Sequence, residues 1–153
     1  MKTILVSRCL LGEACRYDGQ ARPCDRVQAL VGRVRLIPIC PETEGGLPTP
    51  RTPSEIVGGC GRDVLAGRAR VLSEAGEDRT EAFRQGAWKA VETARREGAA
   101  AAILKAKSPS CGVGQIYDGT FRRRLAEGDG VGAAALRALG LPLYTEKDFP
   151  DHF

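Results

Sequence analysis

The chain has 153 residues, with 23 Lys and Arg against 19 Asp and Glu and a formal net charge of +4. This length suits one domain over residues 1–153 with a core of ordinary size. With 42% hydrophobic and 27% charged residues, the composition excludes a wholly disordered chain. No apolar run is long enough to span a membrane, and the short apolar segment after Met1 lacks a signal-peptide cleavage site, so we expect a cytoplasmic protein.

The first half of the chain predicts two buried strands, one helix and a hairpin. The continuous apolar run at residues 4–6 is typical of a strand buried on both faces. Residues 34–39 predict a second strand, in which Pro38 fits only near an end or at an edge of the sheet. Between them, residues 23–31 have Pro near the start, apolar residues at helical spacing and Gly after the end, which predicts a helix. Residues 55–57 and 69–72 flank several glycines and predict a small β-hairpin.

The second half predicts two helices, each followed by a strand. Apolar side chains recur every three and four positions over residues 80–97, and Gly98 follows, which indicates a long helix and its end. Residues 99–105 and 141–144 read as buried strands, with an Ala- and Leu-rich helix at residues 131–139 between them. Alternating strands and helices are typical of parallel βαβ units. The sequence therefore predicts an α/β fold with a mainly parallel, Rossmann-like sheet flanked by helices, and a small β-hairpin insert.

The cysteines follow the predicted strands. Six cysteines are many for a chain expected in a reducing compartment, where metal ligation or thiol chemistry is commoner than disulfides. Cys9, Cys40 and Cys111 each follow a predicted strand, and Cys15 lies on the first of these loops. Right-handed crossovers bring the carboxyl ends of parallel strands to one edge of the sheet, where such folds bind ligands. We expect the three thiols to meet at that edge, within reach of Cys15.

Converging thiolates favour zinc or an iron–sulfur cluster. The chain has no CxxC pair, the usual form of a structural zinc site. Three loops that each carry one thiol suit a larger cluster in which each thiolate binds a different iron. A cluster of four irons that is held by three thiolates has one open iron. Cys24 and Cys60 lie away from the strand ends and are interpreted as structural, and the single histidine, His152, lies in the C-terminal tail.

Polar side chains accompany these thiols. Glu42 lies two residues after the second cysteine, and Ser108 and Ser110 shortly precede the last one. The tripeptide Tyr-Asp-Gly occurs at residues 17–19 and 117–119, as two ordinary turns or as two walls of one pocket. Cations that could hold an anion at this edge are Arg16, Arg51, Lys105 and Lys107. The run Arg122-Arg123-Arg124 is interpreted as a solvated face.

Several long motifs resemble the DUF523 family. They are SRCLLG with CRYDG within residues 7–19, CPE with GGLPTPR within residues 40–51, and KSPSCG with IYDGTF within residues 107–121. The sequence GDGV at residues 128–131 fits the same family. Because the match runs over nearly the whole chain, the protein is identified as a member. Arg8 departs from the family pattern, in which a small residue is expected at that position, and could alter the shape or charge of the pocket.

Characterised DUF523 proteins are thiouracil desulfurases. The resemblance implies a [4Fe-4S] cluster held by Cys9, Cys40 and Cys111, with the fourth iron free to take sulfur from the substrate. It implies catalytic roles for Glu42 and Ser108, and it leaves Cys15 as a further candidate ligand. The residues expected to bind the substrate are Arg16, Tyr17, Ser110, Gly112 and Tyr117.

We therefore expect non-redox desulfuration of a thiolated pyrimidine base such as 2-thiouracil, giving the oxo base and hydrosulfide. The expected partner is a small thiolated base or nucleoside; a nucleic acid is allowed but not required, no membrane is expected, and the oligomeric state stays open. One alternative is a thiol-based redox enzyme using Cys9 and Cys15, which would need a lowered thiol pKa. The other is a non-enzymatic metal- or sulfur-binding module.

Overall fold

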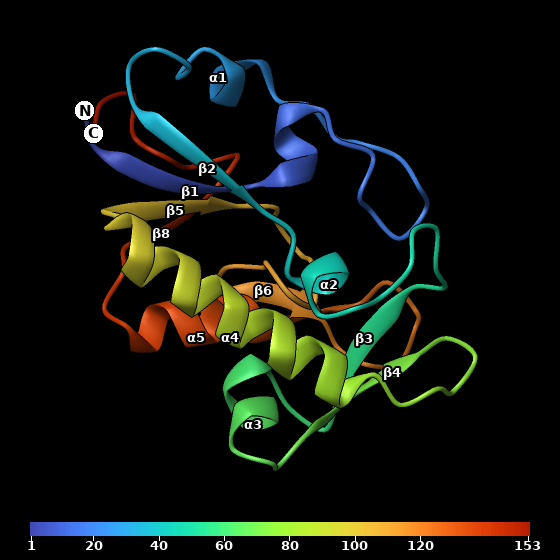
Figure 1. Cartoon of the computed structure of the whole chain (residues 1–153). Coiled ribbons are helices and arrows are strands. Elements are labelled where there is room, and N and C mark those ends of the chain that lie inside the picture. Colours follow the sequence, from blue (N-terminus) through green and yellow to red (C-terminus); the bar gives the residue numbers. More distant parts are fainter.

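The computed structural model describes residues 1–153 and is organised around a four-stranded sheet (Figure 1). Across the sheet the strands are β2 (Arg35–Ile39), β1 (Thr3–Ser7), β5 (Ala101–Leu104) and β8 (Leu143–Thr145). Every pairing between neighbouring strands is parallel. The predicted α/β fold with a mainly parallel sheet is therefore confirmed. None of the helices combines the length and the hydropathy needed to cross a membrane.

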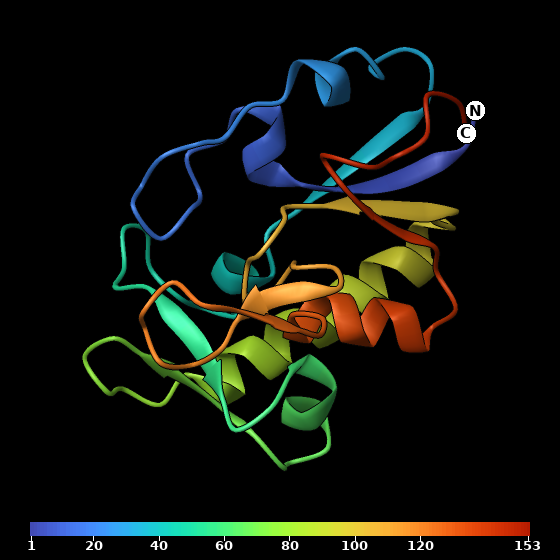
Figure 2. The same cartoon turned by 180° about the vertical axis from the view of Figure 1, so that it is seen from behind.

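Both faces of the sheet are covered, because successive side chains of β1 point to opposite faces. Leu5 belongs to the larger core, under α4 (Thr80–Glu97) and α5 (Val131–Ala138). Ile4 and Val6 belong to a second core on the other face, with η1 (Arg8–Leu11), α1 (Asp25–Gln28) and the C-terminal segment (Figures 1 and 2). A ligand can therefore approach this sheet only from its ends.

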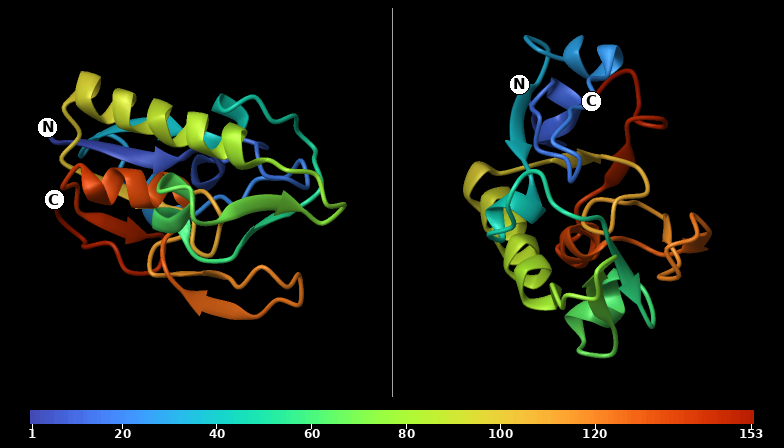
Figure 3. Two further views of the ribbon diagram at one scale, coloured as in Figure 1. Left: turned by 90° about the horizontal axis from the view of Figure 1, so that it is seen from below. Right: turned by 90° about the vertical axis from the view of Figure 1, so that its right-hand side faces the viewer.

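Two antiparallel hairpins extend the molecule at the end where the parallel strands finish (Figure 3). The hairpin predicted from the sequence is formed by β3 (Ser54–Val57) and β4 (Arg70–Ser73), and the short helix α3 (Gly61–Leu65) connects these strands. The second hairpin, β6 (Gln115–Tyr117) with β7 (Leu125–Glu127), was not predicted from the sequence. Its strands are too short for hydrophobic alternation to reveal them.

Two further differences concern short helices. The helix predicted at residues 23–31 is the single turn α1, because only Val27 and Leu30 are buried there and Val31 is 69% exposed. A helix of one turn, α2 (Pro41–Glu44), lies in a segment predicted as a loop. Pro41 at its first position fits a helix start, because proline has no N–H to leave unpaired there.

Glycines bring α2 into close contact with α4. A Cβ added to Gly86 of α4 would overlap the backbone of Pro41, lying 2.7 Å from its carbonyl carbon. A Cβ added to Gly45 would overlap the backbone of Ala82 in the same way. The two backbones therefore approach more closely than any other residues would permit, which fixes the segment directly after Cys40 against the longest helix.

Candidate functional site

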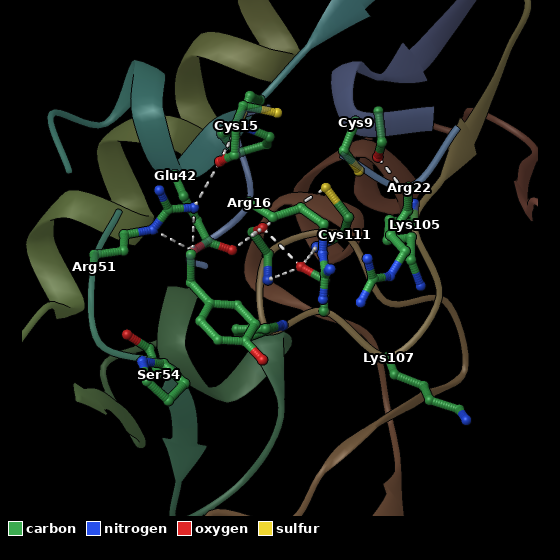
Figure 4. A pocket seen from close by; sticks show the side chains of 18 of the residues that line it. Cys9, Cys15, Arg16, Arg22, Glu42, Arg51, Ser54, Lys105, Lys107 and Cys111 are labelled. Atoms are coloured by element: carbon green, nitrogen blue, oxygen red, sulfur yellow. Dashed lines mark hydrogen bonds and ion pairs between the residues drawn. The ribbon is translucent and has the colours of Figure 1, made fainter. Parts of the chain in front are cut away.

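A pocket of about 550 Å³ lies beyond the carboxyl ends of β1, β2 and β5 (Figure 4). The loops that follow these strands line it, together with residues of both hairpins. Among the residues singled out from the sequence, the pocket is lined by Cys9, Cys15, Arg16, Tyr17, Cys40, Glu42, Ser108, Ser110, Cys111 and Tyr117. Gly112 is not part of the lining. It is buried behind the loop, where a Cβ would lie 2.7 Å from the carbonyl oxygen of Ser108, so its role is to let the loop close.

The four thiols of the pocket come from three separate segments. Cys9 lies in η1, Cys40 directly precedes α2, and Cys111 lies in the loop after β5; all three are buried. Cys15 is half-buried on the loop after η1, and its carbonyl oxygen accepts a long hydrogen bond from the Cys40 thiol at 3.9 Å. No cysteine forms a disulfide. Cys24 and Cys60, interpreted as structural, lie outside the pocket lining.

The surroundings of Cys15, Cys40 and Cys111 raise the pKa of each thiol and so favour its protonated form. Burial raises the pKa of Cys111 to about 12, against opposing hydrogen bonds with Ser7 and Ser110. A hydrogen bond with Cys40 favours the Cys15 thiolate, but the bond with Cys9 and burial outweigh it and raise the pKa of Cys15 to about 11. A thiol redox enzyme needs a lowered pKa at its attacking cysteine. The raised pKa of Cys15 is the opposite of what the redox alternative requires at that residue.

The same thiols fit the ligand set of a polynuclear cluster. No group of three or more His, Cys, Asp or Glu side chains closes around a position for one metal ion. Structural zinc would require four ligands in a tight tetrahedron. Buried soft sulfur donors that enter one pocket from separate loops match the requirement of an iron–sulfur cluster, in which each thiolate binds a different iron.

Glu42 is held by a buried arginine that the sequence had suggested as an anion binder. Arg51, with a side chain 2% exposed, donates from Nε to Glu42 Oε1 at 3.0 Å, and its Nη2 forms an ion pair with the same oxygen at 3.0 Å. Its Nη2 also donates to the Cys15 carbonyl at 3.2 Å, and its Nη1 to the Pro48 carbonyl at 3.0 Å. Arg51 thus joins Glu42 to the loop that carries Cys15, and its charge is already matched within the protein.

Two serines continue from the other oxygen of Glu42. Ser110 Oγ donates to Glu42 Oε2 at 2.9 Å and lies 3.0 Å from Ser108 Oγ. Ser108 Oγ in turn accepts the backbone N–H groups of Ser110 and Cys111, both at 3.1 Å. Glu42, Ser110 and Ser108 therefore form one continuous hydrogen-bonded row beside the thiols.

Arg8, the residue that departs from the family pattern, lines the pocket and pairs with Glu44. Its Nη2 lies 3.4 Å from Glu44 Oε2, which also accepts the backbone N–H of Cys40 at 2.7 Å. The pair therefore links the residue before Cys9 to the backbone of Cys40.

Other cations of the pocket differ in what they pair with. Arg16 pairs with Asp18 at 3.1 Å and its guanidinium stacks over the Tyr17 ring at 5.4 Å, while Lys105 pairs with Glu146 at 3.1 Å.

Lining residues that sequence reasoning missed as site residues include Arg22, Phe121 and Arg123. The last two belong to the β6–β7 turn, which Glu55 anchors by accepting the N–H groups of Gly119 and Phe121 at 2.9 and 3.2 Å. In the sequence, the repeated Tyr-Asp-Gly tripeptide and the family motif IYDGTF pointed to this turn.

Comparisons with known proteins identify the same family that the sequence motifs resemble. The family model described as 2-thiouracil desulfurase matches residues 4–148. The uncharacterized protein YbbK of Bacillus subtilis (strain 168) is 45% identical over 148 residues, which cover 97% of this chain and 98% of that protein. The solved structure of the [4Fe-4S]-dependent thiouracil desulfidase TudS resembles the chain with a TM-score of 0.85 and 38% identity, covering 99% of this chain and 95% of that one.

Proposed function

Because the chain belongs to the 2-thiouracil desulfurase family, we propose that it removes sulfur from a thiolated pyrimidine base such as 2-thiouracil at a [4Fe-4S] cluster. The observation that carries the proposal is the meeting of buried thiols with the Glu42 network in one pocket. The thiocarbonyl group and one water give a carbonyl group and hydrosulfide with a proton. No electron is gained or lost, so no redox partner is needed.

The proposed ligands are Cys9, Cys40 and Cys111. All three are buried and each is fixed by an ordered neighbour: the η1 turn, the start of α2, and the turn closed by Ser108. Cys15 is half-buried on a loop and stays outside this proposed set. When bound, a cluster with three protein ligands supplies an open iron that acts as a Lewis acid toward the substrate sulfur.

The chain's own side chains would handle the water and its proton. Glu42 is the proposed general base, because its carboxylate is 13% exposed, fixed by Arg51 and connected to Ser108 by hydrogen bonds. Ser108 would contact the attacking water, since it lines the pocket and is only half-buried. Tyr17 and Tyr117 would flank the base, with Arg16 stacked behind Tyr17.

The scope of the proposal is a single domain, residues 1–153, acting on small molecules. The pocket volume of about 550 Å³ accommodates a free thiolated base or a nucleoside, and no nucleic acid is required. Six free cysteines suit a reducing compartment such as the cytoplasm.

Metal analysis of cysteine variants tests the ligand set. After anaerobic reconstitution, the unaltered protein should contain about four irons and four sulfides per chain. Cys40→Ser should lose most of both, whereas the matched variant Cys15→Ser should retain them. A fully loaded Cys40→Ser protein, or an empty Cys15→Ser protein, would overturn the assignment.

Activity of a cluster-loaded Glu42 variant tests the base. Glu42→Gln keeps the shape of the side chain but cannot take the proton, so turnover of 2-thiouracil should fall about 10²–10⁴-fold while the iron content stays unchanged. Full activity in this variant would contradict the proposed role.

A further inference from the structure

The row of hydrogen bonds beside the thiols runs along the pocket wall from Ser108 to Glu42. Ser108 lines the pocket and is half-buried, whereas Ser110 is 3% exposed. Ser110 Oγ lies between Ser108 Oγ, at 3.0 Å, and Glu42 Oε2, at 2.9 Å. A group at Ser108 is therefore connected to the Glu42 carboxylate through the hydroxyl of the nearly buried Ser110.

The bonding partners fix the direction in which each hydroxyl donates. Ser108 Oγ accepts two backbone N–H groups, both at 3.1 Å, which occupy its two acceptor positions and leave it able only to donate. The Glu42 carboxylate, paired with Arg51, can only accept. Ser110 must therefore accept from Ser108 and donate to Glu42. Cys111 Sγ, the other acceptor near Ser110, is more distant at 3.7 Å.

From this fixed direction we propose that the Ser110 hydroxyl relays a proton from Ser108 to Glu42 during the reaction. The inference rests on the proposed desulfuration and deepens it. Sequence reasoning had placed Ser110 among the residues that bind the substrate. Its single hydroxyl proton is committed to Glu42, so it is not available to a bound base.

The relay transfers one proton and no electrons. Ser108 gives its proton to Ser110 while Ser110 gives its own to Glu42 Oε2, and the two backbone N–H groups stabilise the oxygen of Ser108 as it becomes negative. An alkoxide has a third acceptor position, through which Ser108 takes a proton from the attacking water. The water oxygen bonds to the thiocarbonyl carbon and the C=S π electrons move to sulfur. Both serines end neutral, Glu42 carries the proton, and hydroxide has been added to the carbon.

Kinetics of the reconstituted holoenzyme with 2-thiouracil distinguish a relay from a substrate contact. Ser110→Ala should lower kcat about 10²-fold, leave KM nearly unchanged and leave the iron content unchanged. Ser110→Thr, which restores a hydroxyl, should recover most of the rate. The matched control Ser73→Ala removes another buried hydroxyl, one that accepts the Glu77 N–H at 3.0 Å outside the pocket, and should keep the unaltered kcat.

Rates in mixtures of H₂O and D₂O add a readout that a structural role would not change. The protons of Ser108, Ser110 and the attacking water all move in the unaltered protein, so its rate should depend on the deuterium fraction along a curve. Ser110→Ala removes both links of the relay, so the dependence of its rate should be close to linear. A raised KM with unchanged kcat, or a Ser110→Thr protein as slow as Ser110→Ala, would overturn the relay.

Neutron diffraction tests the relay separately from activity. Lack of turnover by the unaltered protein would refute the proposed function, yet the hydroxyl directions could still be measured in D₂O-exchanged crystals of the holoenzyme. We expect the Ser110 deuterium on the line to Glu42 Oε2 and the Ser108 deuterium directed at Ser110. A Ser110 deuterium directed at Ser108 or into the pocket would refute the inference.

Discussion

Arg51 allows a quantitative test of how the site is held together. Its side chain is 2% exposed and that of its partner Glu42 is 13% exposed, so water barely screens the pair. Arg51→Met removes the charge and every donor but keeps much of the volume. Breaking a buried ion pair in this way costs about 3–5 kcal/mol, because the remaining charge lies unpaired in the protein. The carbonyls of Cys15 and Pro48 lose donors as well.

This cost is large for a chain of this size. Folded domains are stable by about 5–15 kcal/mol, so Arg51→Met should remove a substantial fraction of the free energy of unfolding. For about 150 residues, each kcal/mol lowers Tm by roughly 2–4 °C, which gives an expected decrease of roughly 6–20 °C. Urea unfolding followed by circular dichroism measures the free energy. The fluorescence of the single tryptophan, Trp88 on α4, provides a second probe.

A second substitution separates the charge effect from the packing effect. Adding Glu42→Gln to Arg51→Met replaces the unpaired carboxylate by a neutral amide, which should recover about 1–3 kcal/mol. An Arg51→Met cost below about 1 kcal/mol, typical of an exposed pair, would refute the reasoning. So would a double variant whose cost equals the sum of the two single costs.

Two further predictions concern the scaffold. Gly86→Ala should lower stability by about 1–3 kcal/mol and reduce iron retention, because the new Cβ overlaps the backbone of Pro41 next to Cys40; unfolding and iron assays that match the unaltered protein would contradict this. Although burial opposes it, hydrogen bonds from Arg137 and the Gly114 N–H lower the pKa of Asp129. The stability that Asp129 contributes is therefore fully present above a pH of about 4, which is the pKa of an aspartate in the unfolded chain. It is lost as the pH falls through the lower pKa that Asp129 has in the folded protein. Asp129→Asn should cost about 1–2 kcal/mol at pH 7, and this difference should shrink in acid; a pH-independent difference would contradict the assignment.

How much of the fold could be predicted from the sequence depended on the length of the hydrophobic pattern in each helix and strand. The helix predicted over residues 80–97 matches α4, because 18 residues contain several repeats of the apolar spacing. The convergence of Cys9, Cys40 and Cys111 followed from the rule that parallel strands end at one edge. The turn α2 and the β6–β7 hairpin contain too few residues to show a period.

The roles of two polar residues depended on geometry that no pattern encodes. From the sequence, Arg51 was interpreted as a cation that could hold an anion at the edge of the sheet. Only the structure shows that it donates to Glu42, nine positions earlier. Ser110 read as a pocket residue, yet its direction of donation follows from two backbone N–H groups that bind Ser108. In both cases the partner, rather than the residue type, decides what the side chain can do.

The most direct test of the desulfurase assignment is an anaerobic assay of 2-thiouracil with the reconstituted protein, in which uracil and sulfide are quantified together. We expect equal amounts of the two products, formed only by protein that contains iron and sulfide. Loaded protein that forms no uracil, or metal-free protein that forms it equally fast, would contradict the assignment.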